Sequence, residues 1–348
     1  MIGSDSTSPA RTSPARTSPA PWDFAAPWGA RGYVTDLDGP VHWIEFGSSL
    51  DPGPGSGRGS GPDPGREGSP IVFVHGLAGS HLNWCLVGPQ LTVGRRTVAL
   101  DLHGFGLTPG TRSNATVRAN ARLLDRFVRE IMGTPVILVG NSMGGLTSVL
   151  QTAAVPDTVA GLVLIDPALP LPRQRLDWQV AGQFLLFALP GFGELFVSRV
   201  LSRRSPDLAV RQLAQLCYAD PSRADPEMLK AEVALAALRQ AAPAHDASAG
   251  RASFLAASRS ILRVLGRREQ FWEMTARIRV PVLLIGGEAD RLIPVASMRQ
   301  AAARNPHWES VIIPGVGHAP QVEVPDLVIG TVRDWLDRRF TPDAGRAG

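Results

Sequence analysis

A short apolar run that leads directly into a glycine-flanked serine constrains this chain more than any other feature. Residues 136–139 are apolar and mostly β-branched, which is typical of a strand buried on both faces of a parallel sheet. The next five residues form a Gly-x-Ser-x-Gly pattern around Ser142, and the small residues after it favour a closely packed helix. Because the flanking glycines lack Cβ atoms, they permit a sharp turn that would raise Ser142 above the edge of the sheet.

Strands and helices are predicted to alternate through most of the chain. The first two strands are expected to form a hairpin that turns at Asp38-Gly39, and helices are expected at 115–132 and 325–340. We therefore predict an α/β fold in which helices flank a mostly parallel, eight-stranded sheet. The expected strands cover residues 32–39, 40–46, 71–74, 97–101, 136–139, 159–165, 280–285 and 310–313.

Changes in composition divide the chain into segments. Residues 1–30 are predicted to be a disordered tail, because their tandem Thr-Ser-Pro-Ala-Arg repeat is too low in hydrophobicity to bury a core. Residues 48–69, which are rich in Gly, Pro, Ser and Asp, are predicted to be a flexible loop. Residues 169–278 interrupt the alternation with helices, so 31–168 and 279–342 are expected to form one α/β core around them.

The composition argues against several classes of function. The formal net charge is only +4 over 348 residues, and no run of Lys or Arg exceeds two residues, so nucleic-acid binding is not expected. Cys85 and Cys217 are the only cysteines and stand in no metal-ligand spacing, so neither a disulfide framework nor a metal site is predicted. No apolar stretch reaches the roughly 18 residues of a membrane span, and an apolar signal region is lacking. We expect a cytoplasmic, reducing setting.

Three further motifs stand at the ends of predicted strands. They are His75-Gly76, then Gly287-Glu288-x-Asp290-x-x-x-Pro294, and finally Pro314-Gly-x-Gly-His318. With the serine turn, these motifs resemble the α/β-hydrolase family, whose members carry a nucleophile, an acid and a histidine in this chain order. The resemblance implies an α/β-hydrolase fold with a helical cap, or lid, inserted at 169–278. It also implies Ser142, Asp290 and His318 as the catalytic residues.

The resemblance assigns roles to residues around this triad. In the family, two backbone N–H groups bind the oxyanion, and here they would belong to Leu77 and Met143. His75 is interpreted as a structural histidine that holds the Leu77 loop. His103 stands where the family usually has proline, near the carboxyl edge of the sheet, and is a possible substrate contact.

Other residues compete for the roles of acid and base. Glu288 lies two residues from Asp290, and Asp166 follows the sixth strand, where some relatives carry their acid. Both remain alternatives to Asp290. His307 lies in an Asn-Pro-His-Trp turn and is expected to be exposed, which favours His318 as the base.

The resemblance implies a serine hydrolase that cleaves a carboxylic ester, as a carboxylesterase or lipase-like enzyme does. The substrate would be a small-molecule ester or acyl compound, and no metal or organic cofactor is needed. Epoxide hydrolases and haloalkane dehalogenases of this fold need a carboxylate nucleophile, which Ser142 does not supply. Carbon–carbon bond hydrolysis, acyl transfer and non-catalytic binding remain alternatives. The apolar stretch 184–197, with Phe184 and Phe187, would line an acyl pocket or touch a lipid surface, or else form the core of the cap. The sequence makes no prediction of oligomeric state.

Overall fold

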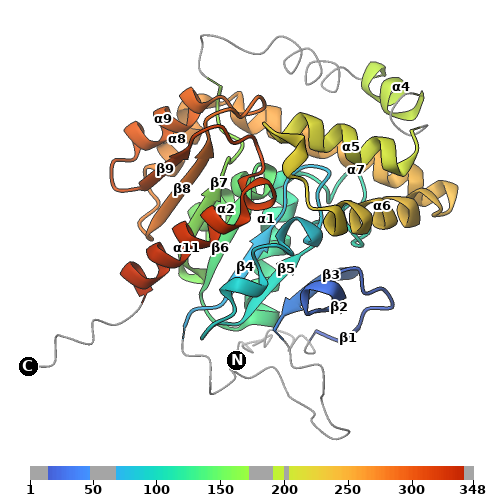
Figure 1. Ribbon diagram of the computed structural model, residues 1–348, viewed down its shortest axis with the longest axis horizontal. Coiled ribbons are helices and arrows are strands. Elements are labelled where there is room, and N and C mark those ends of the chain that lie inside the picture. Colours follow the sequence, from blue (N-terminus) through green and yellow to red (C-terminus); the bar gives the residue numbers. More distant parts are fainter. Residues whose placement is uncertain (1–14, 48–67, 172–190, 200–203, 341–348) are drawn as a thin grey trace, which may run out of the picture.

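The computed structural model describes residues 15–47, 68–171, 191–199 and 204–340 (Figure 1). They contain a nine-stranded sheet with the strand order β1-β2-β3-β5-β4-β6-β7-β8-β9. The pairs β1–β2, β2–β3 and β3–β5 are antiparallel, and all other neighbours are parallel. All eight expected strands are present, which confirms the predicted fold class. The strands are β1 (Thr17–Pro19), β2 (Ala30–Asp36), β3 (Pro40–Phe46), β4 (Ile71–Val74), β5 (Thr97–Leu100), β6 (Val136–Asn141), β7 (Val159–Ile165), β8 (Val282–Gly287) and β9 (Glu309–Ile313).

The ninth strand departs from the sequence-based prediction. The sequence predicts disorder through residue 30, whereas β1 pairs antiparallel with β2, and the hydroxyl oxygens of Thr17 and Thr35 lie 2.8 Å apart. Ala26–Trp28 forms a 3-10 helix next to the buried Ala25. Pairing with an existing sheet edge requires free backbone groups but no core of the segment's own, so low hydrophobicity does not exclude it. Residues 1–14, and 48–67 of the predicted loop, lie outside the described residues.

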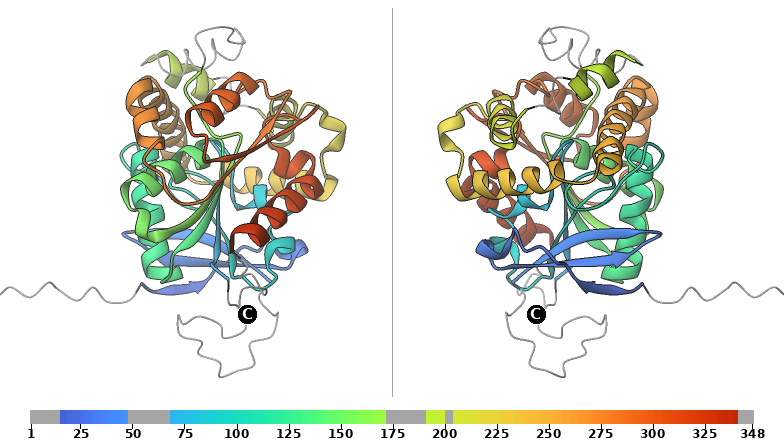
Figure 2. Two further views of the ribbon diagram at one scale, coloured as in Figure 1. Left: turned by 90° about the vertical axis from the view of Figure 1, so that its left-hand side faces the viewer. Right: turned by 90° about the vertical axis from the view of Figure 1, so that its right-hand side faces the viewer.

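The central strands β4, β5, β6 and β8 are buried on both faces, and helices lie on either side of the sheet (Figure 2). Alternate residues of each strand point to opposite faces, so Val72 and Val74 of β4 join one core while Ile71 and Phe73 join the other. The first core also contains apolar residues of α1, α2, α8 and α9, and the second contains those of α11. These helices are α1 (Val117–Phe127), α2 (Met143–Ala154), α8 (Arg268–Thr275), α9 (Val295–Arg304) and α11 (Pro325–Phe340).

The helix predicted at 115–132 is present with different internal geometry. The Thr116 side chain accepts the N–H of Ala119 and caps the start of α1, as hydroxyl side chains commonly do. After Phe127 the chain continues as a π-helical turn, Val128–Met132, and stops at Gly133, whose φ is 69°. The closing helix α11 has the predicted bounds.

The described part of the segment between β7 and β8 consists mostly of helices, and α5, α6 and α7 lie together at one end of the sheet (Figure 1). Its side chains reach the loops that follow the strands: Arg239 of α6 donates to the carbonyl oxygen of Gly104, and Asn83 donates to Glu232. Within the described ranges, none of the helices has the length and hydropathy to span a bilayer. The helices are α4 (Phe192–Arg199), α5 (Pro206–Cys217), α6 (Pro226–Gln240), α7 (Ala244–Leu265) and α8.

The strand order positions the site. From β4 the chain moves to β5 on one side, and then crosses back to β6 on the other side of β4. Such a reversal opens a crevice outside the carboxyl ends of the strands, where ligands bind in open α/β sheets. The residues after β4 and β6 therefore face each other at this edge.

Candidate active site

Ser142 lies on the turn between β6 and α2, in a backbone conformation that L-residues rarely adopt. Its φ is 52° and its ψ is −117°, which costs of order 1–3 kcal/mol. A Cβ added to Gly140 would lie 2.7 Å from the backbone of Gly144, and one added to Gly144 would lie 2.0 Å from the carbonyl oxygen of Val74. The glycine spacing is therefore required by the close packing of α2 against β4 and β6.

Asp290 and His318 form a buried pair at the ends of β8 and β9. The Asp290 and His318 side chains are 0% and 7% exposed, and Nδ1 of His318 lies 2.7 Å from an Asp290 oxygen. The other oxygen of Asp290 accepts the N–H groups of Leu292 and Ile293 at 2.7 and 3.0 Å. The carboxylate thus holds the proton of the imidazole on Nδ1, which leaves Nε2 available as a base.

Hydrogen bonds tie the His318 loop to the serine turn and to α5. The side-chain amide of Asn141, the residue before Ser142, donates to the carbonyl oxygen of His318 at 3.1 Å and to that of Ile165 at 3.0 Å. The N–H of His318 donates to the carbonyl oxygen of Cys217 in α5 at 2.6 Å. The Oγ of Ser142 has no hydrogen-bond partner among the described residues. The structure therefore joins Asp290 to His318 directly, and joins the His318 backbone to the serine turn through the side chain of Asn141.

The two predicted oxyanion-binding amides follow β4 and open α2. A Cβ added to Gly76 would lie 3.2 Å from the Cβ of Ser142, so the loop that carries Leu77 passes directly against the turn. Met143 is the first residue of α2, where helical N–H groups have no partner within the helix. Among the described residues, neither amide donates a backbone hydrogen bond outside the regular elements.

His75 is fixed by two hydrogen bonds to the backbone. Its Nδ1 lies 2.7 Å from the carbonyl oxygen of Gly76, and its Nε2 accepts the N–H of Leu102 at 3.0 Å. The side chain is fully buried, and burial lowers its pKa. With both nitrogens occupied, His75 holds the loop and has no nitrogen left to act as a base.

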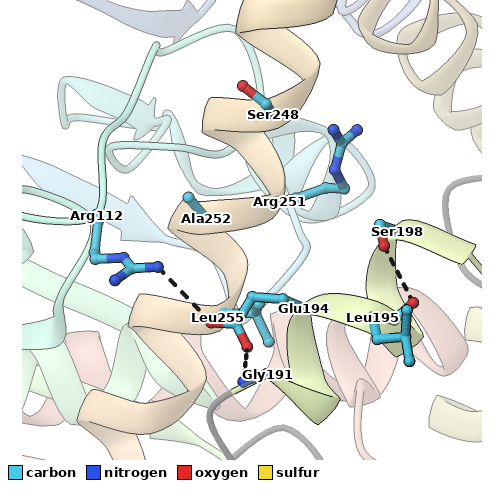
Figure 3. Close-up of a pocket in the computed structure, with 9 residues that line it drawn as sticks. All are labelled: Arg112, Gly191, Glu194, Leu195, Ser198, Ser248, Arg251, Ala252 and Leu255. Atoms are coloured by element: carbon cyan, nitrogen blue, oxygen red, sulfur yellow. Dashed lines mark hydrogen bonds and ion pairs between the residues drawn. The ribbon is translucent and has the colours of Figure 1, made fainter.

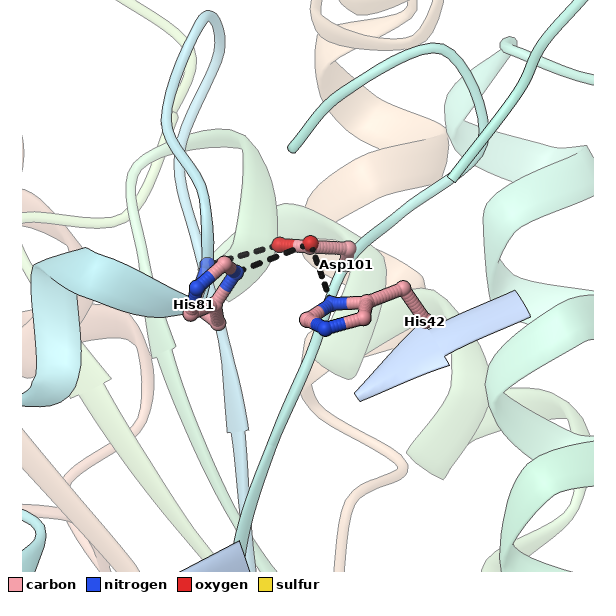
Figure 4. Close-up of side chains that lie close together, drawn as sticks. All are labelled: His42, His81 and Asp101. Atoms are coloured by element: carbon pink, nitrogen blue, oxygen red, sulfur yellow. Dashed lines mark hydrogen bonds and ion pairs between the residues drawn. The ribbon is translucent and has the colours of Figure 1, made fainter. Parts of the chain in front are cut away.

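Asp101, the residue after β5, is a buried carboxylate with several hydrogen-bond partners, and these partners were not identified from the sequence. One of its oxygens lies 2.8 Å from Nδ1 of His42 and 2.9 Å from Nδ1 of His81 (Figure 4). The same oxygen accepts the N–H of Leu107 at 2.8 Å. Burial raises the pKa of Asp101, but His81 and His42 outweigh it and hold that pKa well below the usual range. The sequence did carry one signal of this cluster: His42 lies within the otherwise apolar strand β3, and a buried histidine needs a hydrogen-bond partner.

The same three side chains have the donor set of a metal site, and their ligand atoms lie within 4.8 Å of one another. Their arrangement fits hydrogen bonds from the two histidines to Asp101 better than it fits coordination of a metal ion. Both Nδ1 atoms approach a single oxygen of Asp101, and Nε2 of His42 is buried with no partner among the described residues. A metal-bound histidine almost always donates its second N–H to an acceptor.

The alternative acids and base lie in different places. Asp166 is fully buried at the end of β7 and accepts the N–H of Gly287, and burial together with the charge of Asp290 raises its pKa well above the usual range. Glu288 is exposed. His307 is exposed as predicted, and its Nε2 lies 3.1 Å from the carbonyl oxygen of Ile278. Of these, only Asp166 belongs to the cluster around Asp290 and His318.

His103 lies on the turn after β5, next to the residue that α6 contacts. Its N–H donates to the side chain of Asn120 at 2.9 Å, and burial lowers the pKa of its imidazole. The neighbouring Gly104 accepts the hydrogen bond from Arg239. Phe184 and Phe187, the predicted pocket residues, lie outside the described residues.

Glu232 of α6 is a titratable group that sequence reasoning missed. Its carboxylate accepts from Asn83 at 3.4 Å, and Asn83 belongs to the 3-10 helix His81–Trp84 that follows the Leu77 loop. Burial raises the pKa of Glu232 to about 7. Helix α6 therefore places a buried acid with a raised pKa against the 3-10 helix that follows the Leu77 loop.

A separate surface pocket lies between α4 and α7 (Figure 3). Glu194 at its edge is paired with Arg259 at 2.8 Å and with Arg112 at 3.7 Å. Arg259 is the main reason that the pKa of Glu194 falls to about 2. Ser142, Asp290 and His318 do not line this pocket.

Comparison with known proteins places the chain in a family. The model of the alpha/beta hydrolase fold family matches residues 69–325. The chain belongs to the α/β-hydrolase family, and the predicted resemblance is confirmed. The family match, together with an esterase among the curated relatives, supports hydrolase-fold catalysis.

The individual relatives are distant. The dihydrolipoyllysine-residue acetyltransferase component of the acetoin cleaving system of Pseudomonas putida is 28% identical over 272 residues, which cover 76% of this chain and 62% of that protein's length. A pimeloyl-[acyl-carrier protein] methyl ester esterase of Edwardsiella ictaluri is 26% identical over 269 residues, covering 77% of this chain and 93% of the esterase. The structure of a haloalkane dehalogenase from Agrobacterium tumefaciens aligns with a TM-score of 0.69 at 20% identity, covering 89% of this chain and 97% of the dehalogenase. At that identity the structural similarity shows the fold alone.

Proposed function

We propose that this protein is a serine hydrolase that cleaves carboxylic esters through an acyl-enzyme. Ser142 is the nucleophile, His318 the general base and Asp290 the acid that orients it. The observation that carries the proposal is the buried Asp290–His318 pair, 2.7 Å apart and tied through Asn141 to a serine with a φ of 52°. A serine hydroxyl needs such a base, and the base needs such a carboxylate.

The reaction follows from these positions. Nε2 of His318 accepts the proton of Ser142 as Oγ attacks the ester carbonyl carbon. The negative charge that develops on the carbonyl oxygen is bound by the N–H groups of Leu77 and Met143, and such donors typically contribute about 2.7–4 kcal/mol each. When the tetrahedral intermediate collapses, the alcohol leaves with the proton from His318. Water, activated by the same imidazole, then releases the acid and restores Ser142.

Ester cleavage is favoured over the other chemistries of this fold. Dehalogenases of this fold form their ester intermediate on a carboxylate nucleophile, which Ser142 does not supply. An esterase is also among the curated relatives. Acyl transfer is the second candidate, because an acetyltransferase component is also a relative and the acyl-enzyme would be shared. Carbon–carbon bond hydrolysis is the third. A non-catalytic binding protein would have no need of a strained serine whose turn is hydrogen-bonded to the loop of an oriented histidine.

Substrate choice is proposed to come from the helical segment that follows β7. His103 and Gly104 lie where α6 meets the core, so His103 is a candidate contact for a small-molecule ester. Phe184 and Phe187 are proposed to line an acyl pocket or to meet a lipid surface. The reducing, cytoplasmic setting expected from the sequence is part of this proposal.

A fluorophosphonate probe tests the proposal, because it reacts with an activated serine. The wild-type protein should be labelled once, and Ser142→Ala should not be labelled. Ser148→Ala is the matched control, since Ser148 lies on the same helix and its hydroxyl donates to the carbonyl oxygen of Gly144. Equal labelling of wild type and Ser142→Ala would refute the assignment of the nucleophile. A panel of esters, with and without alcohol or thiol acceptors, separates hydrolysis from transfer.

A further inference from the structure

A buried carboxylate, Glu323, lies shortly after the loop that carries His318. Glu323 ends the short helix α10 (Pro320–Glu323), and its side chain is 0% exposed. One of its oxygens accepts the N–H of Gly317, the residue before His318, at 2.8 Å. A buried carboxylate is costly unless it is paired and hydrogen-bonded, so its other partners show what it contributes.

The other partners of Glu323 belong to the segment that follows α5. The oxygen that binds Gly317 also accepts the N–H of Ala219 at 3.2 Å. The second oxygen accepts the N–H of Asp220 at 3.1 Å and a guanidinium N–H of Arg223 at 3.3 Å. All four partners are donors, which is the hydrogen-bond pattern of an ionised carboxylate. A single side chain thus joins the helical segment to the loop before α10.

The end of α5 also contacts this loop directly. The carbonyl oxygen of Cys217 accepts the N–H of His318 at 2.6 Å, and a Cβ added to Gly317 would lie 2.3 Å from the same oxygen. Tyr218 and Ala319 belong to one apolar cluster. Because the contact is between backbones, no flexible side chain lies between them to absorb a shift of α5.

Two hydrogen bonds hold the backbone of His318, one on each side. Asn141 donates to its carbonyl oxygen at 3.1 Å, which ties it to the serine turn, and Cys217 accepts its N–H. Only the second bond depends on where α5 ends. Glu323 fixes that end, because it accepts the N–H groups of two consecutive residues that follow α5.

We propose that Glu323 is a positioning residue that holds the end of α5 against the histidine loop, and so keeps His318 at the distance from Ser142 that proton transfer requires. This inference rests on the proposed function. Glu323 acts through the backbone of Gly317 and of the residues after Cys217, and it does not touch the reacting atoms. The helical segment then sets the geometry of the base as well as the choice of substrate.

The experiment removes acceptors from Glu323 and measures the chemistry of the folded protein. In Glu323→Gln the side chain keeps its shape, but one of its two oxygens becomes an N–H₂ group. Because both oxygens accept from donors, either orientation of the amide turns N–H₂ toward a donor. We expect kcat for a p-nitrophenyl ester to fall by roughly 10-fold, with KM within about threefold of wild type.

A second readout and a second variant extend this test. Labelling of Ser142 by a fluorophosphonate also needs the base, so it should slow by the same factor as kcat in Glu323→Gln. Glu323→Ala removes all four contacts and should lower kcat on the order of 100-fold, the cost of a displacement of about 1 Å near reacting atoms.

Glu309→Gln is the matched control. Glu309 lies in β9, the strand before the same loop, and its two oxygens accept from Arg338 and Arg339 at 2.8 Å. Both arginines are exposed and can turn into solvent, so this variant should retain the kcat and the labelling rate of wild type.

The assays are run at a temperature at which thermal melting shows Glu323→Gln to be folded. If Glu323→Ala is unfolded there, the isosteric variant decides. Wild-type kcat and labelling rate in Glu323→Gln would overturn the proposal, even with a lower melting temperature, because Glu323 would then stabilise the fold without positioning the base. A rise in KM at unchanged kcat would also overturn it, since that pattern assigns Glu323 to substrate binding. Full activity of Ser142→Ala would instead refute the proposed function, irrespective of Glu323.

Discussion

Substituting Gly144 with alanine tests whether the packing of the serine turn sets the activity. The added Cβ would lie 2.0 Å from the carbonyl oxygen of Val74 and 2.6 Å from that of His75. Both neighbours are backbone atoms of the β4 end, so no side chain can rotate away. Contacts below 3.0 Å essentially never occur for real Cβ atoms, so α2 must move away from β4 by about 1 Å, from 2.0 to 3.0 Å.

This displacement moves Ser142, the residue that precedes α2. A misplacement of about 1 Å near reacting atoms costs on the order of 100-fold in rate, and overpacking typically costs about 1–3 kcal/mol of stability. We expect Gly144→Ala to lose at least that factor in kcat/KM and to melt at a lower temperature. The assay is ester hydrolysis combined with thermal unfolding.

Gly330 provides the matched control for this substitution. It lies exposed in α11, and an added Cβ would meet no atom within 4 Å. Alanine is favoured over glycine inside a helix by up to about 1 kcal/mol, so Gly330→Ala should retain full activity and melt at the same or a higher temperature. Wild-type activity and stability in Gly144→Ala would refute the packing argument.

Three further predictions concern the base, the helical segment and the acyl pocket. Asp290→Asn should lower kcat by roughly 10³–10⁴-fold because the amide favours the wrong imidazole tautomer, whereas Glu288→Gln, which changes an exposed neighbour, should not; steady-state kinetics of both variants decides. Burial raises the pKa of Glu232 from 4.5 to about 7, so wild type loses stability as pH rises through that range, and the stability of Glu232→Gln relative to wild type should grow there by at most about 3 kcal/mol; a constant difference in unfolding free energy across that range would contradict it. Polar replacement of Phe184 or Phe187 should raise KM for long acyl esters more than for acetate, by roughly 0.8 kcal/mol per methylene no longer buried; an equal loss for all esters would assign them to the core of the cap.

The parts of the fold that could be predicted from sequence are those with local causes. Buried strands such as residues 136–139 are continuous apolar runs, and Gly140 and Gly144 are dictated by contacts within one turn and its neighbouring strand. The placement of Asp290 and His318 followed from motif order at strand ends, because parallel strands bring their carboxyl ends to one edge of the sheet.

The parts that could not be predicted depend on contacts between distant segments. The bonds that join Asp101 to His42 and His81 span 59 and 20 residues, and no spacing in the sequence announces them. The pairing of β1 depends on an edge of β2 that is left open by the fold.

Detection of the acyl-enzyme tests the central claim most directly. Wild-type protein is mixed with a p-nitrophenyl ester, quenched with acid during the first turnovers, digested, and analysed by mass spectrometry. The proposed mechanism predicts a burst of p-nitrophenol and a mass increase of one acyl group on the peptide that contains Ser142. Either of two results would contradict it. The first is turnover by Ser142→Ala at the wild-type rate with no adduct on that peptide, and the second is an adduct on a different residue in the wild type.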